Sequence, residues 1–173
     1  MLPTIHIRAA TAADARLLAD LGRRTFTEAF AASNSAEDLR LFLDQTYGEA
    51  IQARELAEPE AWHLLAEADG EAIGFARLRR GAVPGCVTGP DPLELQRIYV
   101  LQAWLGLKAG PALLQRCLDE GWALGARTLW LGVWERNDRA RAFYRRHGFE
   151  EVGDHTFVVG TDPQRDVIMV RSL

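Results

Sequence analysis

The chain has 173 residues, which is enough for one domain with a sizeable core. Its formal net charge of −4 gives no general attraction to nucleic acid or to an anionic membrane, so neither is expected as a partner. We find no leader-like segment and no apolar run that could span a bilayer, so we expect a cytoplasmic protein. Neither the histidines nor Cys86 and Cys117 have the spacing of metal ligands, and no metal is expected.

The N-terminal part of the chain is predicted to form one strand and then helices. Apolar and polar residues alternate over residues 4–10, which predicts a half-buried strand. Thr11 can cap the helix that follows, with Asp14 at its third position as in a capping box. A further helical stretch begins after Asn34 or Ser35, either of which suits an N-cap.

The middle of the chain is predicted to change from helix to sheet. Residues 34–60 are expected to form one or two helices, because Gly48 interrupts the pattern. Residues 61–80 are predicted to be two strands joined at Asp69–Gly70, a strong hairpin signal. The Gly- and Pro-rich segment 81–92 is expected to be a loop.

The C-terminal half alternates between strands and helices. We predict strands at 93–100, 128–134, 149–160 and 165–172 and helices at 110–125 and 137–147. Gly148 ends the second of these helices, as a left-handed residue after a helix does. A turn is expected at Thr161–Pro163. The order of elements predicts a single domain over residues 1–173, of mixed α/β (α+β) class with one central sheet of about seven strands.

A short loop between a strand and a helix contains a possible anion site. Gly106 and Gly110 bracket Lys108, the only lysine in the chain. A helix N-terminus has unpaired N–H groups and positive partial charge, so small residues before it allow a phosphate to approach. The loop has neither the Walker pattern nor the dinucleotide fingerprint. From the residues alone it is either a diphosphate site or a plain packing turn.

The next strand and helix carry a more specific pattern. The sequence WERNDRARAFYRRHGFEEVG resembles the fourth helix of the GNAT superfamily of N-acetyltransferases, N-x-x-A-x-x-F-Y-x-x-x-G-F, at Asn137, Ala140, Phe143, Tyr144, Gly148 and Phe149. The order of elements is similar to that family over nearly the whole chain. The stretch LWLGVWERN and the tail GDHTFVVGTDPQRDVIM resemble, more narrowly, the Pai-type polyamine N-acetyltransferases. The resemblance implies a mainly antiparallel sheet with about four helices, in which strands 4 and 5 are parallel and splayed.

The resemblance also implies acetyl-CoA as co-substrate. In the family, backbone N–H groups of the loop bind the pyrophosphate, which corresponds here to Gly106, Leu107, Lys108, Ala109 and Gly110. The strand before the loop is exposed to the pantetheine arm at Ile98, Tyr99 and Val100. The family pattern Gln/Arg-x-x-Gly-x-Gly/Ala is altered, since Leu105 replaces its first residue and Lys108 its central glycine.

Three residues have catalytic or cofactor roles by resemblance, each with a structural alternative. Glu94 lies at the distance from the loop at which some family members have a general base, or it is a solvated carboxylate. Tyr144 resembles the general acid that protonates the CoA thiolate, or it is a core tyrosine. Asn137 resembles a pantetheine contact and also suits a helix N-cap.

The resemblance also implies that the amine acceptor lies between the early helices and the final hairpin. Its candidate contacts are the aromatic, acidic and imidazole side chains Phe26, Glu28, Phe30, Asp38, Tyr47, Trp62 and His155. The leading hypothesis is an enzyme that acetylates a primary amine of a small molecule, and polyamines are among the candidate acceptors. The alternative is a non-catalytic acyl-CoA-binding or regulatory module, favoured by the changes at Leu105 and Lys108. A homodimer is expected by resemblance.

Overall fold

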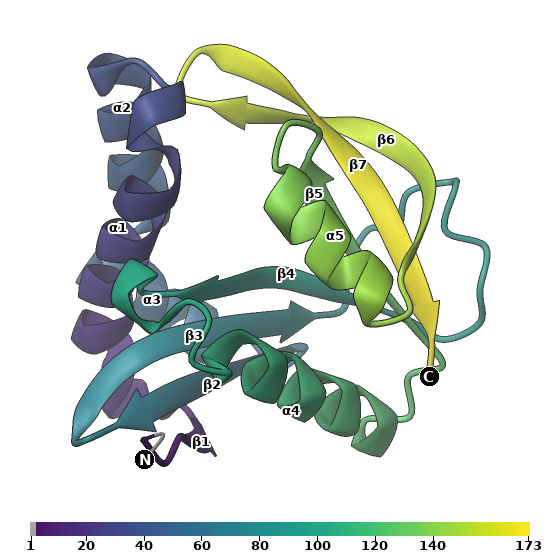
Figure 1. Ribbon diagram of the computed structural model, residues 1–173, viewed down its shortest axis with the longest axis horizontal. Coiled ribbons are helices and arrows are strands. Elements are labelled where there is room, and N and C mark those ends of the chain that lie inside the picture. Colours follow the sequence, from purple (N-terminus) through teal and green to yellow (C-terminus); the bar gives the residue numbers. More distant parts are fainter. Residues whose placement is uncertain (1–2) are drawn as a thin grey trace.

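The central element of the structure is a seven-stranded sheet with the strand order β1-β2-β3-β4-β5-β7-β6 (Figure 1). The structure is a computed structural model, and it describes residues 3–173. The strands are β1 (His6–Ala9), β2 (Ala61–Ala68), β3 (Glu71–Arg79), β4 (Pro92–Val100), β5 (Thr128–Trp134), β6 (Glu150–Val159) and β7 (Asp162–Ser172). Every neighbouring pair is antiparallel except β4 and β5, which are parallel. The predicted mixed, mainly antiparallel sheet is confirmed.

Five α-helices flank the sheet over residues 3–173, one more than the four expected. They are α1 (Ala15–Phe30), α2 (Ala36–Thr46), α3 (Glu49–Leu56), α4 (Ala109–Ala123) and α5 (Asp138–Arg146). Gly48 separates α2 from α3 with an extended backbone and is the N-cap of α3. Ser35 rather than Asn34 caps α2, because its hydroxyl accepts the Asp38 N–H at 3.1 Å.

Several local predictions are confirmed, and one turn is displaced. Asp69 and Gly70 both adopt positive φ in the tight β2–β3 hairpin. Gly148 has a φ of 83° directly after α5 and its C-cap, as predicted. The predicted turn at Thr161–Pro163 is wrong by one residue at its start and two at its end, because the β6–β7 ladder pairs Val159 with Asp162. The turn therefore consists of the two residues between them, of which Gly160 supplies the positive φ.

The parallel strands β4 and β5 pair only at their beginnings. Their register runs from Pro92 opposite Thr128 to Glu94 opposite Trp130, which is three residues of each strand. Beyond that point the strands diverge (Figure 1). We call the unpaired lengths, residues 95–100 of β4 and 131–134 of β5, the β4–β5 splay. The predicted parallel and splayed pair is confirmed.

Two large apolar cores cover the two faces of the sheet, and a third, smaller cluster lies around Trp130 and Ile168. On one face α4 and α5 pack against the strands, with Leu113, Leu114 and Tyr144 among the buried residues. On the other face α1 and α2 contribute Leu18, Phe26 and Leu43. In Figure 1, α1, α2 and α3 lie at one end of the molecule, and α4 and α5 lie away from them beside different parts of the sheet. The splay is thus bordered by a different helical layer on each side.

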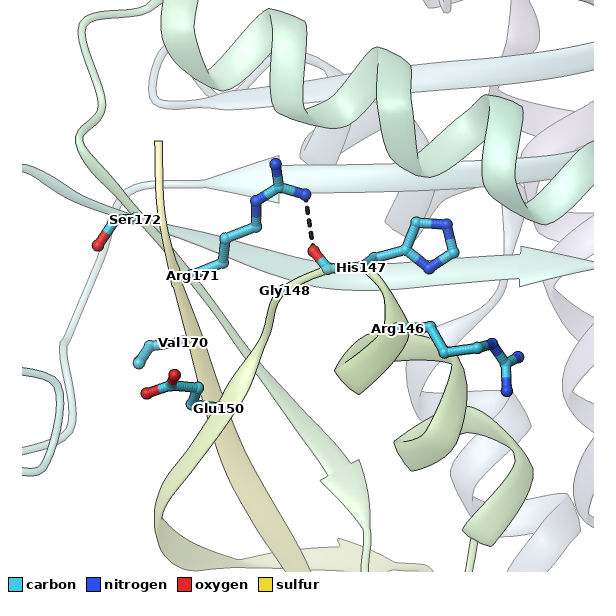
Figure 2. Close-up of a pocket in the computed structure, with 7 residues that line it drawn as sticks. All are labelled: Arg146, His147, Gly148, Glu150, Val170, Arg171 and Ser172. Carbon is cyan, nitrogen blue, oxygen red and sulfur yellow. Dashed lines mark hydrogen bonds between the residues drawn. The ribbon is translucent and has the colours of Figure 1, made fainter.

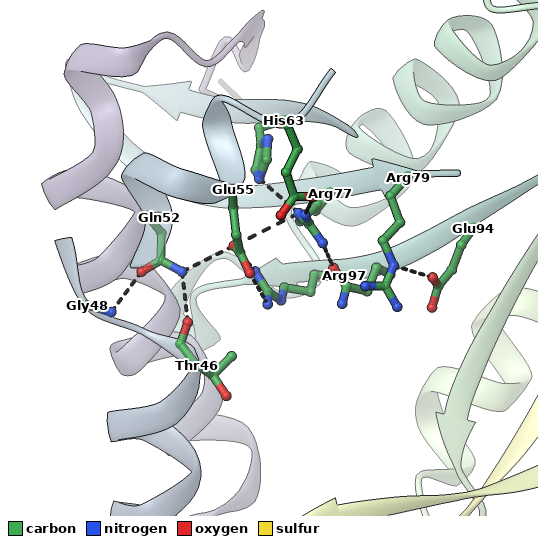
Figure 3. A network of polar contacts seen from close by, with 11 residues as sticks. Thr46, Gly48, Gln52, Glu55, His63, Arg77, Arg79, Glu94 and Arg97 are labelled. Carbon is green, nitrogen blue, oxygen red and sulfur yellow. Dashed lines mark hydrogen bonds and ion pairs between the residues drawn. The ribbon is translucent and has the colours of Figure 1, made fainter. Parts of the chain in front are cut away.

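A buried polar network fastens α3 to the sheet (Figure 3). Arg97 makes a two-pronged ion pair with Glu55 of α3, at 2.6 and 2.9 Å. Arg77 is only 2% exposed; it pairs with Glu58 and donates from Nε to His63 Nε2 at 3.1 Å. Burial, with a further contribution from the Arg77 charge, lowers the pKa of His63 to about 4, so this imidazole is neutral at neutral pH.

Candidate active site

The splay presents different side chains to the two helical layers. Ile98 and Val100 of β4 pack toward the α4 side, whereas Tyr99 faces the α1 side. Phe30 at the end of α1 lies between two aromatic rings of the diverging strands. Its centroid is 6.4 Å from that of Tyr99 and 6.3 Å from that of Trp134, both in edge-to-face geometry. Aromatic faces and edges therefore border the splay on the α1 side.

In the loop before α4, Lys108 has a backbone conformation that glycine adopts more readily than other residues. Lys108 is the N-cap of α4 and has φ 68° and ψ 3°, in the left-handed region. Gly106 also has a positive φ, of 85°. The first bond of the helix runs from the Ala112 N–H to the Lys108 carbonyl at 3.1 Å. The N–H groups of Ala109 and Gly110 precede that bond, so they have no partner within the helix and can bind an anion.

Tyr144 lies on the inner side of α5. Its ring packs edge-to-face against Phe143 and Phe149, and the residue is 8% exposed. Burial raises its pKa well above the usual value, so the phenol stays protonated at neutral pH and can donate a hydrogen bond. Asn137 accepts the Ala140 N–H at 3.1 Å, which makes it the N-cap of α5. Phe143 lies next to Gly110, so α5 and the anion-binding loop are neighbours.

Glu94 is the last residue of β4 that pairs with β5, and the splay begins directly after it. It lies opposite Arg79 of β3, and Arg79 Nε donates to its carboxylate at 2.5 Å (Figure 3). The Glu94 side chain is 11% exposed and the Arg79 side chain 39% exposed. The ion pair occupies one oxygen atom of the Glu94 carboxylate.

The remaining acceptor candidates are distributed unevenly around the splay. Phe26 is buried in the α1 core, stacked on Phe42 with 4.2 Å between centroids. Glu28 accepts the Gln102 N–H at 2.8 Å and so holds the chain just after β4. Trp62 packs into the core on the α4 side, away from the α1 face on which the acceptor was expected.

Two further candidates have structural contacts of their own. Asp38 accepts hydrogen bonds from the Thr161 N–H and hydroxyl at 2.7 and 2.8 Å, which ties the tip of the β6–β7 hairpin to α2. Tyr47 is 2% exposed, and its ring lies beneath the Arg97 guanidinium, 5.3 Å from the centroid. Neither side chain is free to serve as the main contact of a small acceptor.

His155 has a partner that the sequence analysis did not single out. Asp166 of β7 lies directly opposite it in the β6–β7 ladder and also opposite Trp134 of β5. Both side chains lie over Gly132 of β5, where a Cβ atom would come within 2.8 Å of His155 Nε2 and 3.3 Å of Asp166 Oδ2. The signal in the sequence was one acidic residue at the start of a buried apolar run, residues 166–170.

A hollow in the surface lies at the other end of β5. It is lined by the residues drawn in Figure 2, which are Arg146, His147, Gly148, Glu150, Val170, Arg171 and Ser172. Arg171 and Ser172 pair with the first residues of β5, so this hollow is remote from the splay. Arg171 donates to the His147 carbonyl at 2.7 Å and places a positive charge at the C-terminus of α5.

Within residues 3–173 the structure contains no group of three His, Cys, Asp or Glu side chains that could hold a metal ion. In the same range, no helix combines the length and the apolar character needed to cross a membrane.

The geometry agrees with what comparison with known proteins shows. Residues 22–149 match the acetyltransferase (GNAT) family. An uncharacterized N-acetyltransferase of the pepI 3′ region from Lactobacillus delbrueckii subsp. lactis is 32% identical over 153 residues, 88% of this chain and 88% of that protein. The N-alpha-acetyltransferase RimI of Mycobacterium tuberculosis is 32% identical over 150 residues, 86% of this chain and 80% of the relative.

A solved structure has the same fold over almost the full length. The PaiA N-acetyltransferase from Thermoplasma acidophilum, in complex with coenzyme A, superposes with a TM-score of 0.80. The match covers 98% of this chain and 99% of that chain, at 22% identity. At this identity the likeness establishes the fold.

Proposed function

We propose that the acetyl acceptor is a primary amine of a small molecule. The chain belongs to the acetyltransferase (GNAT) family and is an acetyl-CoA-dependent N-acetyltransferase. The observation that supports this proposal is that three features lie around the β4–β5 splay. These are the anion-binding loop before α4, the protonated phenol of Tyr144 on α5, and the aromatic border on the α1 side.

Acetyl-CoA is proposed to enter from the α4 side. The residues present fit its diphosphate, because the backbone from Gly106 to Gly110 combines two positive φ angles with unpaired helix N–H groups. Lys108 is exposed at the same point and adds a positive charge. The pantetheine arm is proposed to run along Ile98, Tyr99 and Val100, with Asn137 beside it at the start of α5.

The reaction proposed is direct attack of the amine on the thioester. Tyr144 is proposed to donate a proton or a hydrogen bond to the leaving thiolate, where negative charge develops in the transition state. A neutral amine is required for attack, so a proton acceptor must lie on the α1 side. Glu94 is one candidate for that acceptor, and its carboxylate is paired with Arg79.

The acceptor class is proposed from the α1 face of the splay. Aromatic rings of Phe30, Tyr99 and Trp134 favour a cationic amine through cation–π contact. The narrower proposal is a Pai-type activity on polyamines, which rests on the resemblance of the final hairpin.

Two measurements test the proposed function. Calorimetry should show that acetyl-CoA binds, and a panel of small amines should release CoA thiol together with N-acetylated product. Peptides with a free N-terminus belong in the panel, since one relative carries the name of an N-alpha-acetyltransferase. Binding without turnover of any acceptor would favour the non-catalytic acyl-CoA-binding module. Absence of acetyl-CoA binding at millimolar concentration would rule out a working donor site.

A further inference from the structure

His155 and Asp166 present Nε2 and a carboxylate oxygen to the same small space, and both atoms are hydrogen-bond acceptors when the imidazole proton is on Nδ1. His155 Nε2 is 3.8 Å from Asp166 Oδ2, which is too long for a hydrogen bond between them. Among residues 3–173, His155 Nε2 is the buried side-chain polar atom that has no hydrogen-bond partner. One N–H group placed beside both atoms can reach each of them at about 2.7–3.2 Å. The pair is therefore shaped to receive a shared donor.

The environment of the pair connects the splay with solvent. Gly132 of β5 leaves the space that both side chains occupy, and a Cβ atom there would collide with the imidazole. The Asp166 side chain is 11% exposed, whereas that of His155 is 36% exposed. One nitrogen of the imidazole thus faces the interior, while another part of the ring reaches water.

We infer that the His155–Asp166 pair receives the ammonium group of the acceptor and that His155 takes its proton, in place of Glu94. This inference rests on the proposed function, because it assigns a role within the same reaction. Asp166 provides a negative charge for the incoming ammonium, and an imidazole nitrogen is a common general base in proteins. Glu94, by contrast, already has a guanidinium partner.

The ionisable groups around the pair are few. Burial raises the pKa of Asp166 to about 6, so its carboxylate is mostly ionised at neutral pH. From β4, Tyr99 is within electrostatic range of Asp166; its pKa is raised, mainly by burial. From the loop before β4, Cys86 packs against Gly153, two residues before His155. Glu135 and Asp154 each form an ion pair with Arg165.

The proposed step is balanced. The ammonium gives one proton to Nε2 of His155, and the freed lone pair forms a bond to the thioester carbon. The carbon–sulfur bond breaks, and the sulfur takes a proton from Tyr144 and leaves as the thiol of CoA. The acylated nitrogen then loses a second proton, which passes through solvent and reprotonates Tyr144. His155 then releases its own proton to water, so each turnover frees one proton.

The test compares His155→Gln and Glu94→Gln over a range of pH, with n-butylamine and spermidine as acceptors. For His155→Gln we expect kcat/KM for the amine to fall roughly 10²–10³-fold at neutral pH. The loss should shrink at about pH 9, because more of the amine is then already neutral. Acetyl-CoA affinity, measured by calorimetry, should stay within about twofold. Glu94→Gln should lack this pH-dependent loss.

His6→Gln is the matched control. His6 also lies close to a carboxylate, with 3.9 Å between its Nδ1 and Glu67 Oε2, but on the far edge of the sheet and with a 72% exposed side chain. It should leave kcat/KM unchanged. A His155→Gln variant with at least half the wild-type kcat/KM would overturn the inference. So would a loss of equal size at every pH, or a pH-dependent loss confined to Glu94→Gln.

A second readout does not depend on turnover. The ring ¹⁵N and ¹H signals of His155 should shift when millimolar n-butylamine is added to the CoA complex, and the shift should be absent in Asp166→Asn. Unmoved ring signals in the wild type would overturn the inference, even if the enzyme acetylates amines. If acetyl-CoA binds and no amine is acetylated, the proposed function fails, and the ring signals still decide whether the pair binds an ammonium.

Discussion

At the scale of single residues, Tyr144 carries the clearest chemical expectation. Tyr144→Phe keeps the ring packed between Phe143 and Phe149 and removes only the hydroxyl. The fold and the acetyl-CoA affinity should therefore persist. Turnover should fall by roughly 10²–10⁴, the usual contribution of a positioned acid, and kcat should change more than KM.

Steady-state kinetics of Tyr144→Phe beside Tyr47→Phe checks this expectation. Tyr47 is also a buried tyrosine, but it lies in the core on the α1 side beneath Arg97. Tyr47→Phe should keep kcat within about twofold of the wild-type value. Full activity of Tyr144→Phe, with an amine for which chemistry limits the rate, would remove Tyr144 from the mechanism.

Asp166 is expected to destabilise the fold at neutral pH. Its pKa is raised from 3.8 to about 6, so the unfolded chain loses this proton first and stability falls as the pH rises between those values. Asp166→Asn should therefore increase the free energy of unfolding at pH 7, by about 1–3 kcal/mol. A group that weakens the fold is expected where function requires it.

Urea denaturation at pH 7 measures this effect, with Asp154→Asn as the control. Asp154 is 51% exposed and paired with Arg165, so its replacement should change stability by about 0.5 kcal/mol or less. If Asp166→Asn is less stable than the wild type, the carboxylate has a structural role that its surroundings do not reveal.

At the scale of elements, two variants of Lys108 in the loop before α4 distinguish the effect of its charge from the effect of its backbone conformation. Lys108→Ala and Lys108→Gly both remove the ammonium, but only glycine adopts the φ of 68° without steric cost. If Lys108 contacts phosphate, both variants should weaken acetyl-CoA binding by about 1–3 kcal/mol. The loss should shrink at high salt, because the side chain is exposed.

Calorimetry at low and high salt distinguishes the outcomes. Unchanged affinity in both variants would mean that backbone N–H groups alone bind the diphosphate. Weaker binding in Lys108→Ala with normal binding in Lys108→Gly would show that the loop geometry matters and the charge does not.

The network beneath α3 should make the fold sensitive to acid. The pKa of His63 is lowered from 6.5 to about 4, so the unfolded state binds a proton first as the pH falls. The stability due to neutral His63 is fully present above pH 6.5 and is lost progressively toward pH 4, up to roughly 3 kcal/mol. Urea denaturation at about pH 7 and pH 4.5 should show a larger acid loss in the wild type than in His63→Gln. Equal losses in both proteins would exclude His63 as the cause.

At the scale of the whole molecule, the order of strands and the parallel pair were predictable because local signals agreed. Asp69–Gly70 fixed a hairpin, and a strand-helix-strand unit requires a parallel pair. The motif around Tyr144 indicated the family and, through that resemblance, the role of the loop before α4. These features depend on residues that are close in sequence.

The partner of His155 could not be predicted in the same way. It depends on the register of β6 and β7, and a turn placed at Thr161–Pro163 pairs His155 with a different residue. The observed two-residue turn at Gly160–Thr161 places Asp166 opposite it. The hydrogen bonds from Thr161 to Asp38 hold that turn, and they join segments more than a hundred residues apart. A shift of one or two residues in a hairpin therefore decides which side chains meet at the splay.

A crystal structure with CoA and a bound primary amine would show both halves of the site at once. We expect a diphosphate on the N–H groups between Gly106 and Gly110, with the sulfur in the β4–β5 splay beside the Tyr144 hydroxyl. The amine nitrogen should lie between His155 Nε2 and Asp166 Oδ2, within hydrogen-bond distance of both. A CoA molecule bound outside the splay, or an amine on the other face of the sheet, would contradict this expectation.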